Sequence, residues 1–92
     1  MNTEHLETDA IVPPGEELAE ELAARGMTPK EFAEKMGVSE RLVSGLLVGE
    51  KPLTAEFALS MERVLGVNPQ LWLNLEAQYR LALARQNERK SA

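Results

Sequence analysis

The stretch TPKEFAEKMGVSERLVSGLLVGE, residues 28–50, decides the fold. It contains two short segments with apolar residues at helical spacing, 29–36 and 40–48, joined by a turn that contains Gly37. Residues typical of helix starts precede both segments. These are Thr28, which has the spacing of a capping box with Glu31, and Ser39. The stretch therefore predicts two helices joined by a tight turn, the unit called helix-turn-helix.

Five residues meet the packing needs of that unit in a single register. Ala33 is small at the point where the second helix crosses the first, and Gly37 suits a turn with positive φ. Val38 can fill the corner, while Val43 and Leu46 fall on the inward face of the second helix. A glycine between two helices is common by itself, so it is the complete set that favours a helix-turn-helix.

Start and stop signals predict three further helices, at about residues 16–25, 55–65 and 69–87. A glycine follows each of the first two, and the last has a proline in its first turn. The sequence shows no strand alternation and no internal repeat. It therefore predicts an all-α fold, a compact bundle of five helices. Besides the helix-turn-helix residues above, those expected in its core are Leu18, Ala19, Leu22, Ala23, Phe32, Met36, Leu42, Leu47, Phe57, Ala58, Met61, Val64, Leu65 and Trp72.

Length and composition point to one small domain. The chain has 92 residues, of which 43% are hydrophobic and 4% aromatic, so we expect a core of Leu, Ala, Val and Met. The absence of cysteine excludes disulfides and thiolate metal sites and is compatible with a reducing, cytoplasmic location. No apolar run approaches the roughly 18 residues of a membrane span. We expect a flexible acidic arm at 1–12, the domain at 13–87 and a frayed tail at 88–92.

Charge is unevenly distributed along the chain, whose net charge is −5. Residues 1–24 carry seven acidic side chains and no Lys or Arg. Residues 25–92 carry eight acidic and ten basic side chains, a net of +2. The acidic front part is either a solvated segment or a contact for a basic partner. We assign that contact to four glutamates of the first helix, Glu16, Glu17, Glu20 and Glu21.

The last predicted helix has apolar residues on two faces, if residues are placed at 100° intervals. The first face carries Leu71, Trp72, Leu75, Tyr79, Ala82 and Leu83. The second face carries Leu73, Ala77, Leu81 and Ala84. A surface helix of a monomer needs only one apolar stripe, so we expect the first face to close the core and the second to meet another subunit. Burial of both faces within one domain is the alternative. Glu76 and Arg80 have the i,i+4 spacing of an ion pair.

Three segments closely resemble the HigA family of antitoxins from toxin–antitoxin modules. They are PPGEELAEEL (13–22), MTPKEFAEKMGVSERLVSGLLVGEKPLT (27–54) and FALSMERVLGVNPQLWLNLEAQYRLALA (57–84). The resemblance covers about residues 13–85, and NPQLWLNLEAQY (68–79) is its most specific part, because general members of the larger XRE, or Cro/CI-like, group lack it. It implies a lambda-repressor-like fold and a homodimer that binds a palindromic operator in its own promoter. It also implies a partner, a basic, RelE-like mRNA-cleaving toxin of the HigB type.

The helix-turn-helix register also predicts which residues meet double-stranded DNA. The second helix of such a unit enters the major groove, and its first residues contact base edges. Those residues are Ser39, Glu40, Arg41 and Ser44. Arg41 is the strongest candidate, because a guanidinium matches guanine O6 and N7. Phosphate contacts are expected from Thr28, Lys30 and Lys51.

Two positions depart from the family pattern. Pro29 and Lys30 stand where many relatives carry Gln at the start of the first helix of the unit, which weakens the expected phosphate contact. Gly45 lies in mid-helix, at a cost of up to about 1 kcal/mol in helix propensity. Either this helix runs close to the DNA backbone at Gly45, or the position is simply weak.

The residue inventory disfavours an enzyme. His5 is the only histidine, and there is no cysteine, histidine cluster or Gly-rich phosphate loop. No metal or cofactor site is apparent. The sequence therefore predicts an antitoxin that represses its own operon and neutralises a toxin. The alternatives are a stand-alone XRE-type repressor and a helix-turn-helix that serves only as a protein-binding scaffold.

Overall fold

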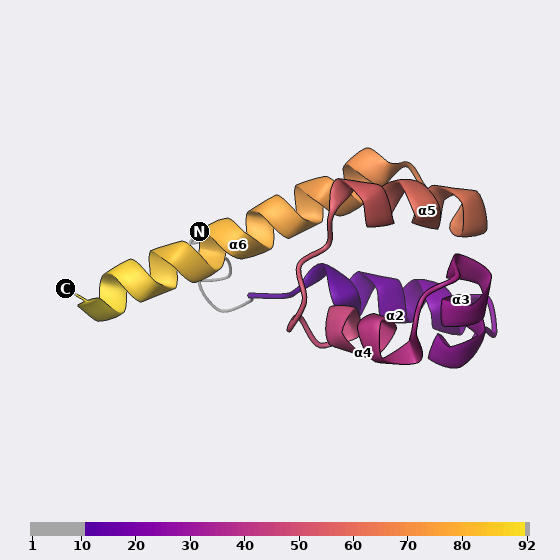
Figure 1. Ribbon diagram of the computed structural model, residues 1–92. Helices are drawn as coiled ribbons and strands as arrows, with labels where there is room; N and C mark the ends of the chain where they lie inside the picture. Colours follow the sequence, from indigo (N-terminus) through magenta and orange to yellow (C-terminus); the bar gives the residue numbers. More distant parts are fainter. Residues whose placement is uncertain (1–10, 92) are drawn as a thin grey trace.

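The computed structural model describes residues 11–91 of the chain, and in this range the fold consists of five helices without a strand (Figure 1). The helices are α2 (Pro14–Ala24), α3 (Pro29–Met36), α4 (Glu40–Leu47), α5 (Ala55–Leu65) and α6 (Pro69–Ser91). The predicted all-α class and helix number are confirmed. Of the predicted acidic arm, residues 1–10 lie outside the described part.

Helix α2 lies against both α4 and α6, while α5 packs along the first turns of α6 (Figure 1). The remaining turns of α6 project beyond the other helices, which gives an elongated molecule of 44 × 28 × 20 Å. The fully buried side chains come from every helix and from the loop before α5. They are Leu18, Leu22, Phe32, Ala33, Val43, Leu46, Leu53, Ala58, Met61, Leu65 and Trp72.

Two helix boundaries differ from the prediction. Helix α2 starts at Pro14 instead of residue 16, because Pro13 is extended and the fixed φ of Pro14 suits the first helical position. Helix α6 runs to Ser91, through the residues expected to fray after 87. Its last turns consist of good helix formers without Gly or Pro, and Arg89 and Lys90 suit the negative end of the helix dipole.

Three core assignments were wrong. Ala19 and Ala23 are exposed, because the buried sector of α2 is narrow and both lie beyond its edge. Leu71 is 45% exposed, because α6 turns Trp72 rather than Leu71 toward the body of the protein. Conversely, Leu53, in the loop between α4 and α5, is part of the core, although no sequence pattern predicted it.

Gly15 allows α2 and α4 to approach more closely than a residue with a side chain at this position would. A Cβ atom at Gly15 would lie 2.2 Å from the carbonyl oxygen of Leu46 and 2.4 Å from that of Leu47. These are backbone atoms at the end of α4, so they cannot move aside as a side chain could. The crossing of α2 over the end of α4 therefore requires glycine.

At its other end α2 is joined to α5 by Arg25. The Nη2 atom of Arg25 donates a hydrogen bond of 2.7 Å to the carbonyl oxygen of Leu65, and its Nε atom donates one of 2.9 Å to Glu21. A carbonyl in the last turn of a helix has no partner within the helix. Arg25 thus satisfies the end of α5 and fixes its position relative to α2.

We predict that Gly15→Ala destabilises the fold by about 1–3 kcal/mol, the usual cost of forcing extra volume into a packed contact. Gly45→Ala is the matched control, since a Cβ there would meet the side chain of Lys51 at 2.5 Å rather than backbone. That side chain can rotate away, and alanine adds helix propensity. Urea unfolding of both variants measures the difference, and equal free energies of unfolding would contradict the role of Gly15.

Candidate nucleic-acid interface

The turn between α3 and α4 has the geometry that the sequence predicted. Gly37 has φ 74° and ends α3 in the left-handed conformation. The backbone N–H of Val38 donates a 3.0 Å hydrogen bond to the carbonyl of Ala33, which satisfies one of the last carbonyls of α3. Ala33 is 3% exposed and lies where the two helices pack. The helix-turn-helix unit is therefore confirmed.

Helix α4 is divided between a buried and an open face. Val43 and Leu46 are buried in the core, whereas Glu40, Arg41 and Ser44 are exposed. Ser39 caps the helix, because its Oγ atom accepts a 3.1 Å hydrogen bond from the backbone N–H of Leu42. The residues predicted to meet bases therefore lie together at the uncovered start of α4.

The side chain of Arg41 is available for an outside partner. It is exposed, and no other side chain described in residues 11–91 forms an ion pair with it. The ion pairs in this part of the chain are Glu21–Arg25, at 2.8 Å, and Glu76–Arg80, which confirms the predicted i,i+4 pair at 2.6 Å. No internal contact has to break for Arg41 to bind.

The start of α3 presents a second group of predicted contacts. Thr28 and Glu31 form the predicted capping box: Thr28 Oγ1 accepts from the N–H of Glu31 at 3.1 Å, and Glu31 Oε1 accepts from the N–H of Thr28 at 2.8 Å. Thr28 and Lys30 are both exposed. The capping role does not use the hydroxyl hydrogen of Thr28, which can still be donated to an outside acceptor.

Lys51 explains the glycine in the middle of α4. The aliphatic stem of Lys51 lies over Gly45, where a Cβ atom would come within 2.5 Å of Lys51 Cγ. The backbone N–H groups of Glu50 and Lys51 also donate hydrogen bonds to the carbonyl of Gly45, at 2.9 and 3.2 Å. Gly45 thus makes room for the returning loop. This packing against Lys51, which neither sequence-based explanation anticipated, ties Lys51 to α4.

The charges of the helix-turn-helix segment cancel. Residues 28–51 carry four basic and four acidic side chains, and all eight are exposed. The basic ones are Lys30, Lys35, Arg41 and Lys51. In the described residues no group of three or more His, Asp or Glu side chains is placed to hold a metal ion. The surface therefore offers individual contacts rather than a broad positive field.

The acidic side chains of α2 lie outside the helix-turn-helix unit. Glu16, Glu17 and Glu20 are exposed and form no ion pair with another described residue. Glu21 differs from them, because its charge is compensated by Arg25. Three of the four glutamates assigned to a basic partner are thus free to bind one.

The two apolar faces of α6 have different environments. On the first face Trp72 is 1% exposed and Leu75 packs against the core. On the second face Leu73 also packs against the core, whereas Ala77, Leu81 and Ala84 are exposed. No helix of residues 11–91 has the length and hydropathy needed to cross a membrane.

Comparison with known proteins agrees with this geometry. The helix-turn-helix family HTH_3 matches residues 17–72. The uncharacterized HTH-type transcriptional regulator YddM of Escherichia coli (strain K12) is 38% identical over 71 residues, which cover 77% of this chain and 76% of that protein.

Solved structures of HigA proteins have the same fold. An addiction module antidote protein of the HigA family from Coxiella burnetii has a TM-score of 0.79 at 32% identity, covering 87% of this chain and 88% of that one. The Pseudomonas aeruginosa antitoxin HigA, solved with the higBA promoter, has a TM-score of 0.82 at 28% identity, covering 89% and 90%. The chain therefore belongs to the XRE-type helix-turn-helix family, a family of DNA-binding regulators and antitoxins rather than enzymes, and has the architecture of HigA antitoxins.

Proposed function

We propose that this protein is the cytoplasmic antitoxin of a type II toxin–antitoxin module, which represses its own operon as a DNA-binding homodimer and neutralises a basic mRNA-cleaving toxin. The observation that carries the proposal is the open face of α4, where Arg41 is exposed and unpaired in a fold that matches HigA antitoxins. The similar Pseudomonas aeruginosa HigA was solved with promoter DNA, which supports the DNA-binding part.

In the proposed complex α4 enters the major groove with its first turn. The guanidinium of Arg41 donates two hydrogen bonds to a guanine, and Glu40 accepts one from a cytosine amino group or orients Arg41. Ser39 and Ser44 are short enough to let the helix approach the bases. These four side chains select the operator sequence.

Phosphate contacts position the protein on the duplex. Thr28 and Lys30 lie at the start of α3, where the helix dipole favours an anion and the Lys30 ammonium and the Thr28 hydroxyl can donate to it, because the N–H groups of Thr28 and Glu31 are used by the capping box. The stem of Lys51 lies over Gly45 of α4, so its ammonium group can contact a phosphate near the recognition helix. Such contacts bind all DNA sequences alike.

A homodimer would supply the second half of the DNA contact. Two recognition helices must be about 34 Å apart to enter successive major grooves on one side of the duplex. The exposed part of the second α6 face, Ala77, Leu81 and Ala84, is the proposed contribution of α6 to this dimer, together with the adjoining Leu73. Two subunits double the number of base and phosphate contacts that each could make alone.

The acidic side of α2 is the proposed toxin contact. A toxin that binds mRNA needs a basic surface, and exposed carboxylates can occupy it. Glu16, Glu17 and Glu20 are available, while Glu21 contributes less because of its pair with Arg25. Separate surfaces for toxin and DNA would explain how an acidic protein binds a polyanion.

A stand-alone transcriptional repressor is the second candidate. The similarity to YddM, an HTH-type transcriptional regulator, supports this second candidate. Co-expression with the neighbouring open reading frame and purification through a tag on the present chain distinguishes the two. A stoichiometric complex with a small basic protein supports the antitoxin, and its absence together with promoter binding supports the repressor.

We predict that Arg41→Ala weakens binding to the DNA fragment upstream of the gene by about 1–3 kcal/mol, because one bidentate base contact is lost. Arg41→Lys should keep the charge and the non-specific binding but lose most of the discrimination between bases. Fluorescence anisotropy with the promoter fragment and a scrambled duplex measures both. Unchanged affinity of Arg41→Ala for the promoter would remove Arg41 from the interface.

Lys51→Met should weaken binding to all duplexes about equally and reduce the dependence of log K on log salt by roughly one unit. Methionine keeps an unbranched apolar stem over Gly45, so the free energy of unfolding should change little. Lys51→Arg, which keeps the charge, is the control and should leave the salt slope unchanged. A slope that is equal in all three proteins would show that Lys51 contacts no phosphate.

Reversal of charge at Glu16 and Glu20 to lysine should weaken toxin binding by about tenfold or more, since each change replaces attraction by repulsion at the interface. The Glu21–Arg25 pair stays intact in this variant, so its stability should be preserved. Isothermal titration with the co-purified toxin provides the measurement. Affinity equal to that of the wild type would restrict these acids to a role in solubility.

A further inference from the structure

The open face of α4 carries an apolar side chain near its centre. Val48 is 63% exposed, more than any other large apolar side chain of residues 11–91. Its backbone N–H donates a 3.2 Å hydrogen bond to the carbonyl oxygen of Ser44, so the helical register of α4 continues through Val48. At 100° per residue, Val48 lies about 20° from Arg41 and between Ser44 and Gly45 around the helix. A duplex that contacts Arg41 therefore faces Val48 as well.

The stem of Lys51 extends this apolar surface. Its Cγ, Cε and Cδ atoms lie 2.5, 3.4 and 3.5 Å from the position that a Cβ atom on Gly45 would take. Three methylene groups thus cover Gly45, about 60° around the helix from Val48. The open face of α4 is therefore polar at its start, where Glu40 and Arg41 lie, and apolar at its end.

An apolar side chain on this face can distinguish one base from the others. Among the base edges exposed in the major groove, thymine alone presents an apolar group, its C5-methyl. A valine placed against a donor or acceptor removes water from it without replacing the lost hydrogen bond, which is unfavourable. Placed against the thymine methyl group, the valine buries apolar surface of both partners, which is favourable. Val48 therefore fits thymine.

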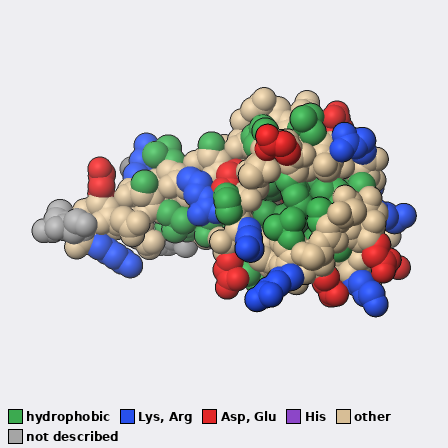
Figure 2. Space-filling view, viewed as in Figure 1, with side chains coloured by type: hydrophobic (Ala, Val, Ile, Leu, Met, Phe, Trp, Pro, Cys, Tyr) green, Lys and Arg blue, Asp and Glu red, His purple; other side chains and the backbone are tan. Residues whose placement is uncertain are grey.

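The charges around α4 give little help in selecting a DNA sequence. Figure 2 shows basic and acidic side chains interspersed over α3 and α4, and residues 28–51 carry four of each. Attraction to phosphates is also the same for every sequence. Short-range contacts with base edges, such as one by Val48, therefore have a large share in the choice of operator.

We propose that Val48 is a specificity-determining residue that contacts the C5-methyl group of a thymine in each operator half-site. A helix rises about 1.5 Å per residue, so Val48 lies about 10 Å beyond Arg41 along α4, or about three base steps of 3.4 Å. Each half-site then combines the guanine bound by Arg41 with a thymine about three base pairs away. The inference rests on the proposed function and adds a second base to its site.

Replacement of single thymines of the promoter fragment by uracil tests this contact, because it removes only the methyl group and keeps the base pair. At one thymine in each half-site, wild-type binding should become about fourfold weaker, the effect of one methyl group that is no longer buried. For Val48→Ala the same replacement should change the dissociation constant less than about 1.5-fold, because the partner of the methyl group is already lost. Fluorescence anisotropy measures both proteins on both duplexes.

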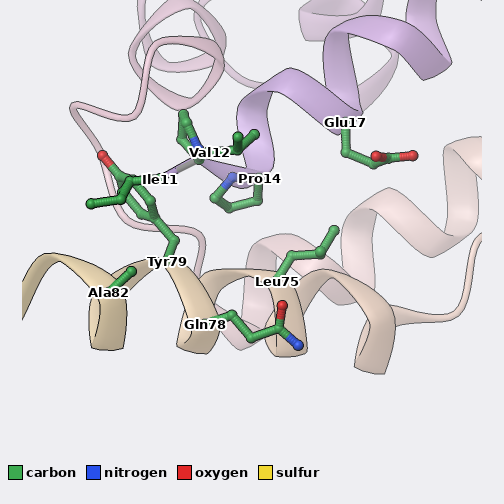
Figure 3. Close-up of a pocket in the computed structure, with 9 residues that line it drawn as sticks. Ile11, Val12, Pro14, Glu17, Leu75, Gln78, Tyr79 and Ala82 are labelled. Carbon is green, nitrogen blue, oxygen red and sulfur yellow. The ribbon is translucent and has the colours of Figure 1, made fainter. Parts of the chain in front are cut away.

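Val12→Ala is the matched control, since it removes the same two methyl groups from another exposed valine. Val12 is 48% exposed and lines a pocket of about 190 Å³ between the segment before α2 and the middle of α6 (Figure 3). No DNA contact is proposed at this pocket. The variant should therefore show the same fourfold response to uracil as the wild type. Circular dichroism checks that both variants are folded.

A duplex with 5-methylcytosine gives a second, independent measurement. If the contacted T·A pair is replaced by C·G, the methyl group and the thymine O4 are both lost. Methylation of this cytosine returns the methyl group alone. The wild type should bind the methylated duplex about fourfold more tightly than the unmethylated one, whereas Val48→Ala should bind the two equally.

Three results would overturn the inference. These are a wild type that no uracil replacement weakens, an equal response of the wild type and Val48→Ala to every replacement, and a loss of the response in Val12→Ala as well. Affinity for the promoter and for a scrambled duplex is measured in the same titrations. A wild type that prefers the promoter but ignores the methyl groups contradicts only the role of Val48. A wild type without that preference contradicts the proposed function and the inference together.

Discussion

The position of α4 depends on a contact between the backbones of α2 and α4. Gly15 lies so close to the carbonyl oxygens of Leu46 and Leu47 that any Cβ atom would overlap them. This contact fixes the end of α4, and the buried side chain of Val43 fixes its middle. In this position α4 turns Glu40, Arg41 and Ser44 toward solvent. The exposure of Arg41 is a consequence of this packing rather than a property of arginine alone.

The sequence predicted the fold because its helix signals are local and consistent. The capping box at Thr28 and the left-handed glycines at the ends of α3 and α5 appear in the structure where the pattern indicated. The core residues predicted from helical spacing were also confirmed in α4, where one broad face of the helix is buried. These features depend on neighbours within four residues, which a sequence shows directly.

The contacts that the sequence did not reveal join segments distant along the chain. Gly15 meets α4 some thirty residues away, and Arg25 bonds to Leu65 across forty. The packing of Lys51 over Gly45 was missed for a related reason, since it depends on how the loop after α4 turns back. In the candidate site, the face of α4 could therefore be predicted from periodicity. The packing of Lys51 over Gly45 and the pocket beside α6 could not be predicted, because both arise from tertiary contacts.

The charge distribution links these observations. Four acidic side chains offset the four basic ones in residues 28–51, so one copy can neutralise few phosphates. Binding that depends on so few contacts gains most from a second, symmetric copy, because the contacts of both then act on one duplex. The acidic side chains that give the chain its net negative charge are concentrated in residues 1–24, outside the helix-turn-helix unit. On this view the acidic residues of α2 are compatible with DNA binding because they serve the proposed toxin contact, while the residues proposed to contact DNA belong to a segment without net charge.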